Sequence, residues 1–173
     1  EIKCGVEVGK DVTIDELKKH GYKAFYIAIG CQGGKRPGVK NDDAKGTAIA
    51  VEYLRHCFEH REDSFSGNVA IDCARNAHRL GATDVKMFCL ESRDTMPASN
   101  EEILEAEEEN VGINPSWGPK EVTVNDKGEV TGIIFKKCLR TIDPETGKFS
   151  PVYDENETVE IKADKIVFAI GQA

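Results

Sequence analysis

The stretch Phe65-Ser-Gly-Asn-Val-Ala-Ile-Asp72 stands directly before a helical pattern. A glycine turn that leads into a helix lets the backbone approach a pyrophosphate, and the helix N-terminus supplies amide donors and a favourable dipole. Ala70, three residues after Gly67, is small enough for the helix to pack closely on a strand. The stretch therefore predicts the first turn of a dinucleotide-binding βαβ unit, with the amides of Gly67, Asn68 and Val69 beside the pyrophosphate.

The residues after this helix supply the second half of the unit. Asp84-Val-Lys-Met-Phe-Cys-Leu90 predicts a strand, and Glu91 follows at its end, where a carboxylate can accept hydrogen bonds from ribose hydroxyls. Glu91 would repel a 2′-phosphate, whereas the guanidinium of Arg93 could pair with one. We predict that Glu91 and Arg93 lie at the adenosine ribose, and that NADH is preferred to NADPH.

The remaining patterns predict helices and strands in alternation, followed by antiparallel strands. Strands are expected at residues 1–8, 23–30, 84–90, 122–124, 130–139, 157–161 and 165–170, and helices at 13–21, 46–60, 67–81 and 99–110. The apolar run 23–30 is typical of a strand buried on both faces. Asn125-Asp-Lys-Gly128 predicts a hairpin turn, in which Gly128 takes the positive-φ position. This order indicates an α/β fold, a Rossmann-like dinucleotide-binding domain with an antiparallel β-meander.

Composition excludes several other classes of protein. The chain has 173 residues with 31 acidic and 23 basic side chains, and its net charge of −8 argues against a nucleic-acid partner. No apolar run reaches the roughly 20 residues of a membrane helix, and no signal peptide is recognisable, so we expect a cytoplasmic protein. The six cysteines form no C-x-x-C pair and are predicted to be buried thiols. The histidines lack metal-ligand spacing. The glutamates of residues 101–109 predict a solvated helix face.

Four motifs occur in order along the chain: Asn68-Val-Ala-Ile-Asp-Cys-Ala-Arg75, His78-Arg-Leu-Gly-Ala82, Ser92-Arg-Asp-Thr-Met-Pro-Ala98 and Ala163-Asp-Lys-Ile-Val-Phe-Ala-Ile-Gly-Gln172. Together with residues 15–30 they resemble the glutamate synthase small subunit family of FAD-dependent pyridine nucleotide oxidoreductases. The resemblance implies that an NAD(P)H-binding domain is inserted within an FAD domain. It also implies that hydride passes from nicotinamide to FAD and on to iron-sulfur clusters.

The same resemblance implies a division of the chain into three parts. Residues 1–39 would be a partial FAD-domain segment, residues 40–162 the NAD(P)H-binding insert, and residues 163–173 the return strand to the FAD domain. Gly30 and Gly171 would end the two crossover strands next to the cofactors. The family's FAD-binding glycine loop and its cluster cysteines have no counterpart here. We therefore expect FAD to be held only in the parent protein and the fragment alone to be inactive.

The partners implied by the resemblance are the rest of the FAD domain, the iron-sulfur domain of the parent chain and a large electron-accepting subunit. Catalysis would be positional, because no side chain here has the setting of a nucleophile or general base and the cofactors carry the chemistry. No metal-binding residue is expected in this part of the chain.

The chain departs from the family pattern at residues 61–67, which are polar and contain one glycine. The family has a hydrophobic strand and three glycines there, so either the native chain has lost the central strand or a segment is omitted between Ser64 and Asn68. This departure favours an alternative, a non-catalytic structural or docking domain that has lost its cofactor. A second alternative is another Rossmann-type enzyme, such as a methyltransferase, against which the two Ala-Ile-Gly strands speak.

Overall fold

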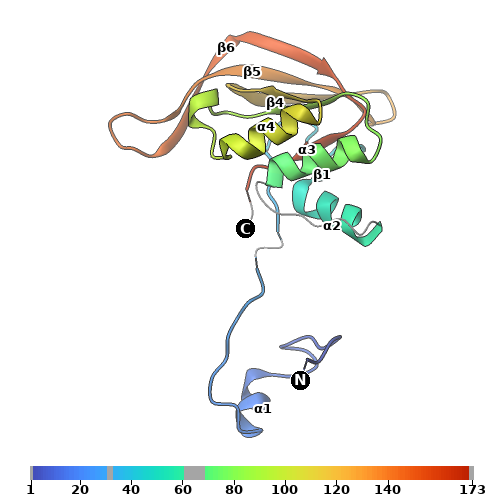
Figure 1. Cartoon of the computed structure of the whole chain (residues 1–173), viewed down its shortest axis with the longest axis vertical. Coiled ribbons are helices and arrows are strands. Elements are labelled where there is room, and N and C mark those ends of the chain that lie inside the picture. Colours follow the sequence, from blue (N-terminus) through green and yellow to red (C-terminus); the bar gives the residue numbers. More distant parts are fainter. Residues whose placement is uncertain (1, 31–32, 61–68, 172–173) are drawn as a thin grey trace. The chain divides into compact units, whose positions relative to one another are not determined.

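The computed structural model describes residues 2–30, 33–60 and 69–171 and consists of two compact units, residues 1–30 and 31–173 (Figure 1). The smaller unit contains the helix α1 (Ile14–Lys19), which begins with a capping box. The Thr13 hydroxyl accepts a hydrogen bond from the Glu16 amide at 3.2 Å, and the Glu16 carboxylate accepts one from the Thr13 amide at 2.8 Å. The helix ends before Gly21, whose φ is 95°. The prediction of this helix is confirmed.

The two strands predicted in the smaller unit are wrong. Residues 2–8 form only an isolated bridge, between Val8 and Val12, and no described segment pairs with residues 23–30. A strand exists only where a neighbour takes up its backbone hydrogen bonds, and apolar side chains do not supply one. The side chains expected to be buried are instead open, since Tyr26 is 95%, Ile27 77% and Ile29 78% exposed.

Over residues 33–60 and 69–171, the larger unit contains two pairs of parallel strands. β1 (Thr47–Ile49) pairs with β7 (Ile166–Phe168), and β2 (Val85–Phe88) pairs with β3 (Val111–Asn114). The helix predicted from residue 46 therefore begins later, because the residues at its expected start pair with β7. The strand β3 was not predicted, since it is short and contains a glycine.

In the same described ranges, three α-helices and a short 3-10 helix lie between these strands along the chain. They are α2 (Ala50–His60), α3 (Val69–Arg79), η1 (Arg93–Thr95) and α4 (Asn100–Glu108). α4 begins with a second capping box, in which the Ser99 hydroxyl accepts from the Glu102 amide and the Glu102 carboxylate accepts from the Ser99 amide. The helices predicted around α3 and α4 are confirmed over the described residues.

The last third of the chain forms a three-stranded antiparallel sheet in the order β4 (Trp117–Val124), β5 (Val130–Ile142) and β6 (Phe149–Lys162). Gly128 has a φ of 71° in the turn between β4 and β5, as predicted. The Asn125 side-chain oxygen accepts from the amides of Lys127 and Glu129 and closes this turn. β5 and β6 are longer than predicted, and they form the long hairpin of Figure 1.

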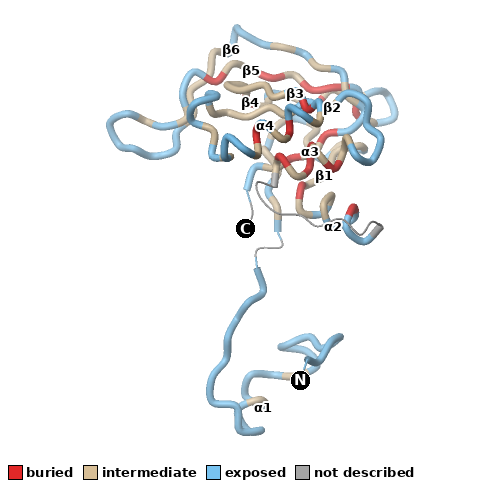
Figure 2. Tube along the Cα trace, in the orientation of Figure 1, coloured by how far each residue is buried: buried red, intermediate tan, exposed pale blue. Residues whose placement is uncertain are grey.

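The larger unit is held together by two hydrophobic clusters, and its buried residues follow β5, α3 and α4 (Figure 2). One cluster packs α3 and α4 on the parallel pair β2–β3, and the other packs the antiparallel sheet on β7. Their buried members are Ile71, Ala74, Ile103, Ala106 and Val111 in the first, and Val122, Val130, Ile133, Phe135, Ile166 and Phe168 in the second. The rings of Phe88 on β2 and Phe135 on β5 stack at 4.0 Å between centroids. The pair β2–β3 therefore lies between the two helices and the antiparallel sheet.

Candidate dinucleotide site

The candidate site lies where β2 and β3 end. The strands are parallel, so their carboxyl ends lie at the same edge. α3 packs on β2 and a short turn joins the end of α3 to the start of β2, so the N-terminus of α3 is directed toward this edge. The first turn of a helix carries amide groups with no partner inside the helix. Of the three residues predicted at the pyrophosphate, Val69 is the first of α3, while Gly67 and Asn68 lie outside the described residues, as does the predicted loss of a strand at residues 61–67.

The backbone of Glu91 is fixed by the connection between β3 and β4. The Glu91 carbonyl accepts a hydrogen bond from the Ser116 amide at 2.9 Å, and the Cys89 carbonyl accepts one from the Trp117 amide at 2.8 Å. Ser116 adopts a φ of 64°, a left-handed conformation that few non-glycine residues take. No sequence pattern singled out Ser116. The predicted ribose residue is thus held beyond the end of β2 on a backbone with fixed hydrogen bonds.

The side chain of Glu91 is half-buried beside the antiparallel sheet. Burial raises the pKa of the Cys89 thiol to about 11, and the Glu91 charge adds to the shift. The pKa values of Cys138 and Tyr153 are also raised, chiefly by burial and in smaller part by the same carboxylate. A side chain at Gly118 would clash with Tyr153 of the same sheet and with Leu90, the residue before Glu91, because a Cβ atom there would lie 2.5 Å from Cε1 of Tyr153 and 2.9 Å from Cδ2 of Leu90. The glycine therefore allows the sheet to approach the Glu91 segment.

Arg93 follows two residues later and is engaged by α4. Its Nη1 atom lies 2.9 Å from Oε1 of Glu107, and its Nη2 atom lies 3.0 Å from Oε2 of the same residue. This is a bidentate pair, with both side chains close to half exposed. Arg93 also lowers the pKa of the Cys89 thiol, opposite to the effect of Glu91. Both predicted ribose residues therefore act on one thiol at the end of β2.

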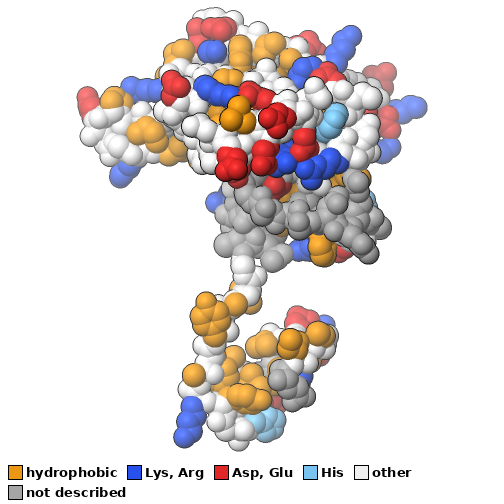
Figure 3. All heavy atoms as spheres, viewed as in Figure 1, with side chains coloured by type: hydrophobic (Ala, Val, Ile, Leu, Met, Phe, Trp, Pro, Cys, Tyr) orange, Lys and Arg blue, Asp and Glu red, His pale blue; other side chains and the backbone are white. Residues whose placement is uncertain are grey.

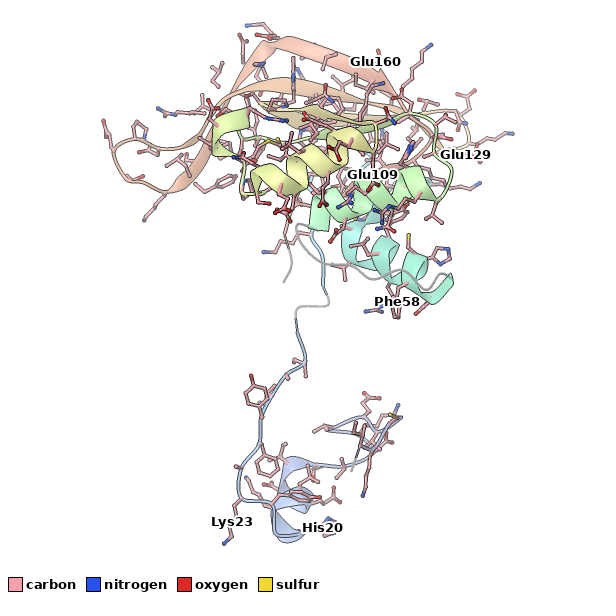
Figure 4. The ribbon with its side chains drawn as sticks, viewed as in Figure 1. His20, Lys23, Phe58, Glu109, Glu129 and Glu160 are labelled. Carbon is pink, nitrogen blue, oxygen red and sulfur yellow. The ribbon has the colours of Figure 1, made fainter. Side chains whose placement is uncertain are left out.

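The glutamates of α4 were predicted to form a solvated helix face, but some of them form ion pairs with α3. Arg75 on α3 pairs with Glu105 and Glu109 at 2.6 Å each, and Arg79 pairs with Glu109 at 2.6 Å. Figure 3 shows acidic and basic side chains side by side over the two helices, and Glu109 is labelled between them in Figure 4. The hydrogen bond from Arg79 lowers the pKa of Glu109, and Arg75 adds to the effect. These ion pairs tie α4 to α3, because the acids stand opposite arginines that the sequence places on another helix.

The remaining predictions for the site divide between the two units. Gly30 and Gly171 both have positive φ, 63° and 109°, but they belong to different units, so their placement next to cofactors stays a prediction. Cys57, Cys73 and Cys138 are buried as predicted, whereas Cys4 is exposed.

Within residues 2–30, 33–60 and 69–171 no group of His, Cys, Asp or Glu could hold a metal ion. None of the helices described has the length and apolarity needed to cross a membrane.

Comparison with solved structures defines the class of fold. FprA from Mycobacterium tuberculosis in complex with NADPH superimposes with a TM-score of 0.75 over 96% of this chain and 54% of FprA, at 16% sequence identity. The chain thus has the fold of the FAD- and NAD(P)-binding oxidoreductases, with mixed helices and strands. At this identity the likeness concerns the fold alone.

Sequence comparison places the chain more narrowly. It is 33% identical over 183 residues to the NADP(+)-dependent formate dehydrogenase subunit beta of Moorella thermoacetica, and 28% identical over 194 residues to the glutamate synthase [NADPH] small chain of Escherichia coli (strain K12). Each match covers 99% of this chain, but only 26% and 40% of the relatives. No family model matches. The chain is homologous to the glutamate synthase small chain and related oxidoreductases, which confirms the resemblance found in its motifs.

The predicted preference for NADH finds no support in these comparisons. Both relatives carry NADPH or NADP(+) in their names, and FprA is described with NADPH. The two candidate side chains, Glu91 and Arg93, are suited to different dinucleotides.

Proposed function

We propose that this chain is the pyridine nucleotide-binding part of a flavoprotein oxidoreductase that passes hydride from NAD(P)H to FAD and on to iron-sulfur clusters. The observation that carries the proposal is the arrangement at the carboxyl ends of β2 and β3. The N-terminus of α3 is directed to the edge where Glu91 is fixed by Ser116. Homology over nearly the whole chain supports the class of reaction. The chain spans about a quarter to two fifths of its relatives, so activity belongs to a larger assembly.

The residues of this chain fit a dinucleotide in chemical terms. The amides at Gly67, Asn68 and Val69 would hold the pyrophosphate at the start of α3, where the helix dipole favours an anion. Ala70 leaves α3 free to pack closely against the sheet. The Glu91 carboxylate would accept hydrogen bonds from the ribose hydroxyls of the adenosine. Redox chemistry is supplied by NAD(P)H and FAD when bound, and the protein's part is to position them.

The proposal extends to the partners and to FAD. The residues around Gly30 and Gly171 would lie in the FAD domain of the parent protein, and this chain by itself would not retain FAD. Two of the relatives are named as subunits or chains of larger enzymes, which supports an electron-accepting partner. The non-catalytic alternative is not favoured by these relatives, because they are named as a subunit of a formate dehydrogenase and as the small chain of a glutamate synthase.

Selectivity between the dinucleotides offers a direct test of the role of Glu91. Calorimetric titration of the chain with NADH and with NADPH should give binding of at least one. Glu91→Arg should raise the affinity for NADPH relative to NADH by about tenfold, because a carboxylate is replaced by a guanidinium at the 2′ position. Glu101→Arg makes the same change of charge on α4 and serves as the control. An unchanged ratio in Glu91→Arg would remove Glu91 from the ribose site, and no binding of either dinucleotide at millimolar concentration would refute the proposed function.

A further inference from the structure

The guanidinium of Arg93 already has a partner on both of its terminal nitrogens. Its Nη1 and Nη2 atoms lie 2.9 Å and 3.0 Å from Oε1 and Oε2 of Glu107. A phosphate would accept two hydrogen bonds from the guanidinium in the same bidentate geometry. Arg93 is the cation two residues beyond Glu91, within the segment that would face the adenosine ribose. Any 2′-phosphate that used Arg93 would therefore meet the carboxylate of Glu107.

We propose that Glu107 is a selectivity-determining residue, which occupies Arg93 and thereby disfavours a dinucleotide that carries a 2′-phosphate. This inference rests on the proposed dinucleotide site. Glu107 comes from α4, a helix that none of the predicted site residues belongs to, so it adds a second element to the site. Glu91 and Glu107 then act together, because Glu91 repels the 2′-phosphate at the strand end and Glu107 keeps Arg93 paired.

The position of Glu107 separates it from the other glutamates of α4. Glu105 and Glu109 pair with arginines of α3 and tie the two helices together. Glu107 pairs instead with η1, the segment that follows Glu91. Both side chains of this pair are about half exposed, 44% and 42%, so it can open without disturbing the core. Solvent-exposed ion pairs of this kind are weak, so the loss of the Arg93–Glu107 pair in exchange for a phosphate contact costs little.

The test compares the charge-neutral variant Glu107→Gln with Glu108→Gln, an exposed neighbour that removes the same charge from the same helix. The dissociation constants for NADPH and NADH are measured by titration calorimetry on the full chain. Glu107→Gln should lower the constant for NADPH relative to that for NADH by about fivefold, since Arg93 becomes available to the phosphate. Glu108→Gln should leave the ratio unchanged. The double variant Arg93→Gln/Glu107→Gln should lose the gain.

The outcomes separate the inference from the proposed function. If the wild-type chain binds either dinucleotide but Glu107→Gln leaves the ratio unchanged, Glu107 has no role in selectivity while the site stands. If Glu107→Gln weakens NADPH binding, Glu107 favours NADPH by orienting Arg93 toward the phosphate. That result would overturn the inference. If neither dinucleotide binds the wild-type chain or any of the variants, the proposed function fails, and the inference with it. Circular dichroism of each variant checks that the fold is retained.

Discussion

Two apolar segments, Lys23-Ala-Phe-Tyr-Ile-Ala-Ile-Gly30 and Lys165-Ile-Val-Phe-Ala-Ile-Gly171, share a leading lysine and a closing Ala-Ile-Gly, yet only the second contains a strand. In the second segment Ile166 and Phe168 are 9% and 5% exposed and lie in β7. In the first, Ile27 and Ile29 are 77% and 78% exposed. The contrast is greatest at Phe168 and its counterpart Ile27, whereas Ile170, the counterpart of Ile29, is itself 48% exposed.

The difference lies in the neighbour. β7 runs parallel to β1, and the Ile166 amide donates to the Gly46 carbonyl at 3.0 Å at the start of the pair. Phe168 then packs with Phe135 and Val122 in the core below the antiparallel sheet. Among the segments that the structure describes, none pairs with residues 23–30. A strand-like pattern indicates which side chains can be buried. They become buried only where another segment pairs with the backbone of that strand.

The largest difference between the two segments should appear on deleting a ring or branched side chain. Phe168→Ala should lower the free energy of unfolding by about 3–4 kcal/mol, because it removes a buried aromatic side chain and leaves a cavity. Ile27→Ala should change it by less than about 0.5 kcal/mol, since the side chain is exposed. Urea denaturation followed by circular dichroism measures both. Equal losses would show that residues 23–30 are buried in solution and would end the comparison.

A second, smaller effect should follow from crowding the start of the β1–β7 pair. Gly46 has a φ of 109°, and a Cβ atom there would lie 3.1 Å from the Asp164 carbonyl oxygen and 3.2 Å from Val130. Gly46→Ala should therefore destabilise the larger unit by about 1–3 kcal/mol. Gly21 also has a positive φ, 95°, but a Cβ atom there would meet nothing within 4 Å, so Gly21→Ala is the matched control. It should leave the denaturation midpoint of the larger unit unchanged, and a shift as large as that of Gly46→Ala would argue against two separate units.

The smallest effect concerns the capping boxes of two α-helices, α1 in the smaller unit and α4 in the larger one. Ser99→Ala should cost about 1 kcal/mol in the cooperative unfolding of the larger unit, because α4 packs into its core through Ile103 and Ala106. Thr13→Ala removes the same kind of bond from α1, which buries no residue, so it should weaken α1 without moving that transition. Carbon chemical shifts of residues 14–19 would report the loss of helix. A cooperative loss in Thr13→Ala would mean that α1 is part of the larger unit's fold.

Most of the local structure could be predicted because its causes are local. The capping boxes at Thr13 and Ser99, and the turn at Gly128, depend on residues within a few positions of one another. The strands that were missed or wrongly predicted depend on distant partners. β1 requires β7 more than one hundred residues later, β3 requires β2, and residues 23–30 have no partner among the described residues. Sequence periodicity contains no direct information on such pairings.

The candidate site follows the same rule. Glu91 was predicted from its place after a strand, which is a local signal, and its contact with a dinucleotide stays a prediction. Its support by Ser116, and the pairing of Arg93 with Glu107, arise only when β3 and α4 fold against β2. The solvated face predicted for α4 holds only in part for the same reason, because Glu105 and Glu109 meet arginines of α3 while Glu101, Glu107 and Glu108 are exposed.

The central claim, a dinucleotide at the carboxyl ends of β2 and β3, is tested most directly by mapping amide chemical shifts of the labelled chain during titration with NADPH and with NADH. The account predicts saturable shifts at residues 67–71 and 91–93, with larger changes at the latter for the more tightly bound dinucleotide. Amides of residues 2–21 and of the tip between β5 and β6 should not move. Shifts confined to those distant residues, or no shift at millimolar concentration of either dinucleotide, would contradict the claim.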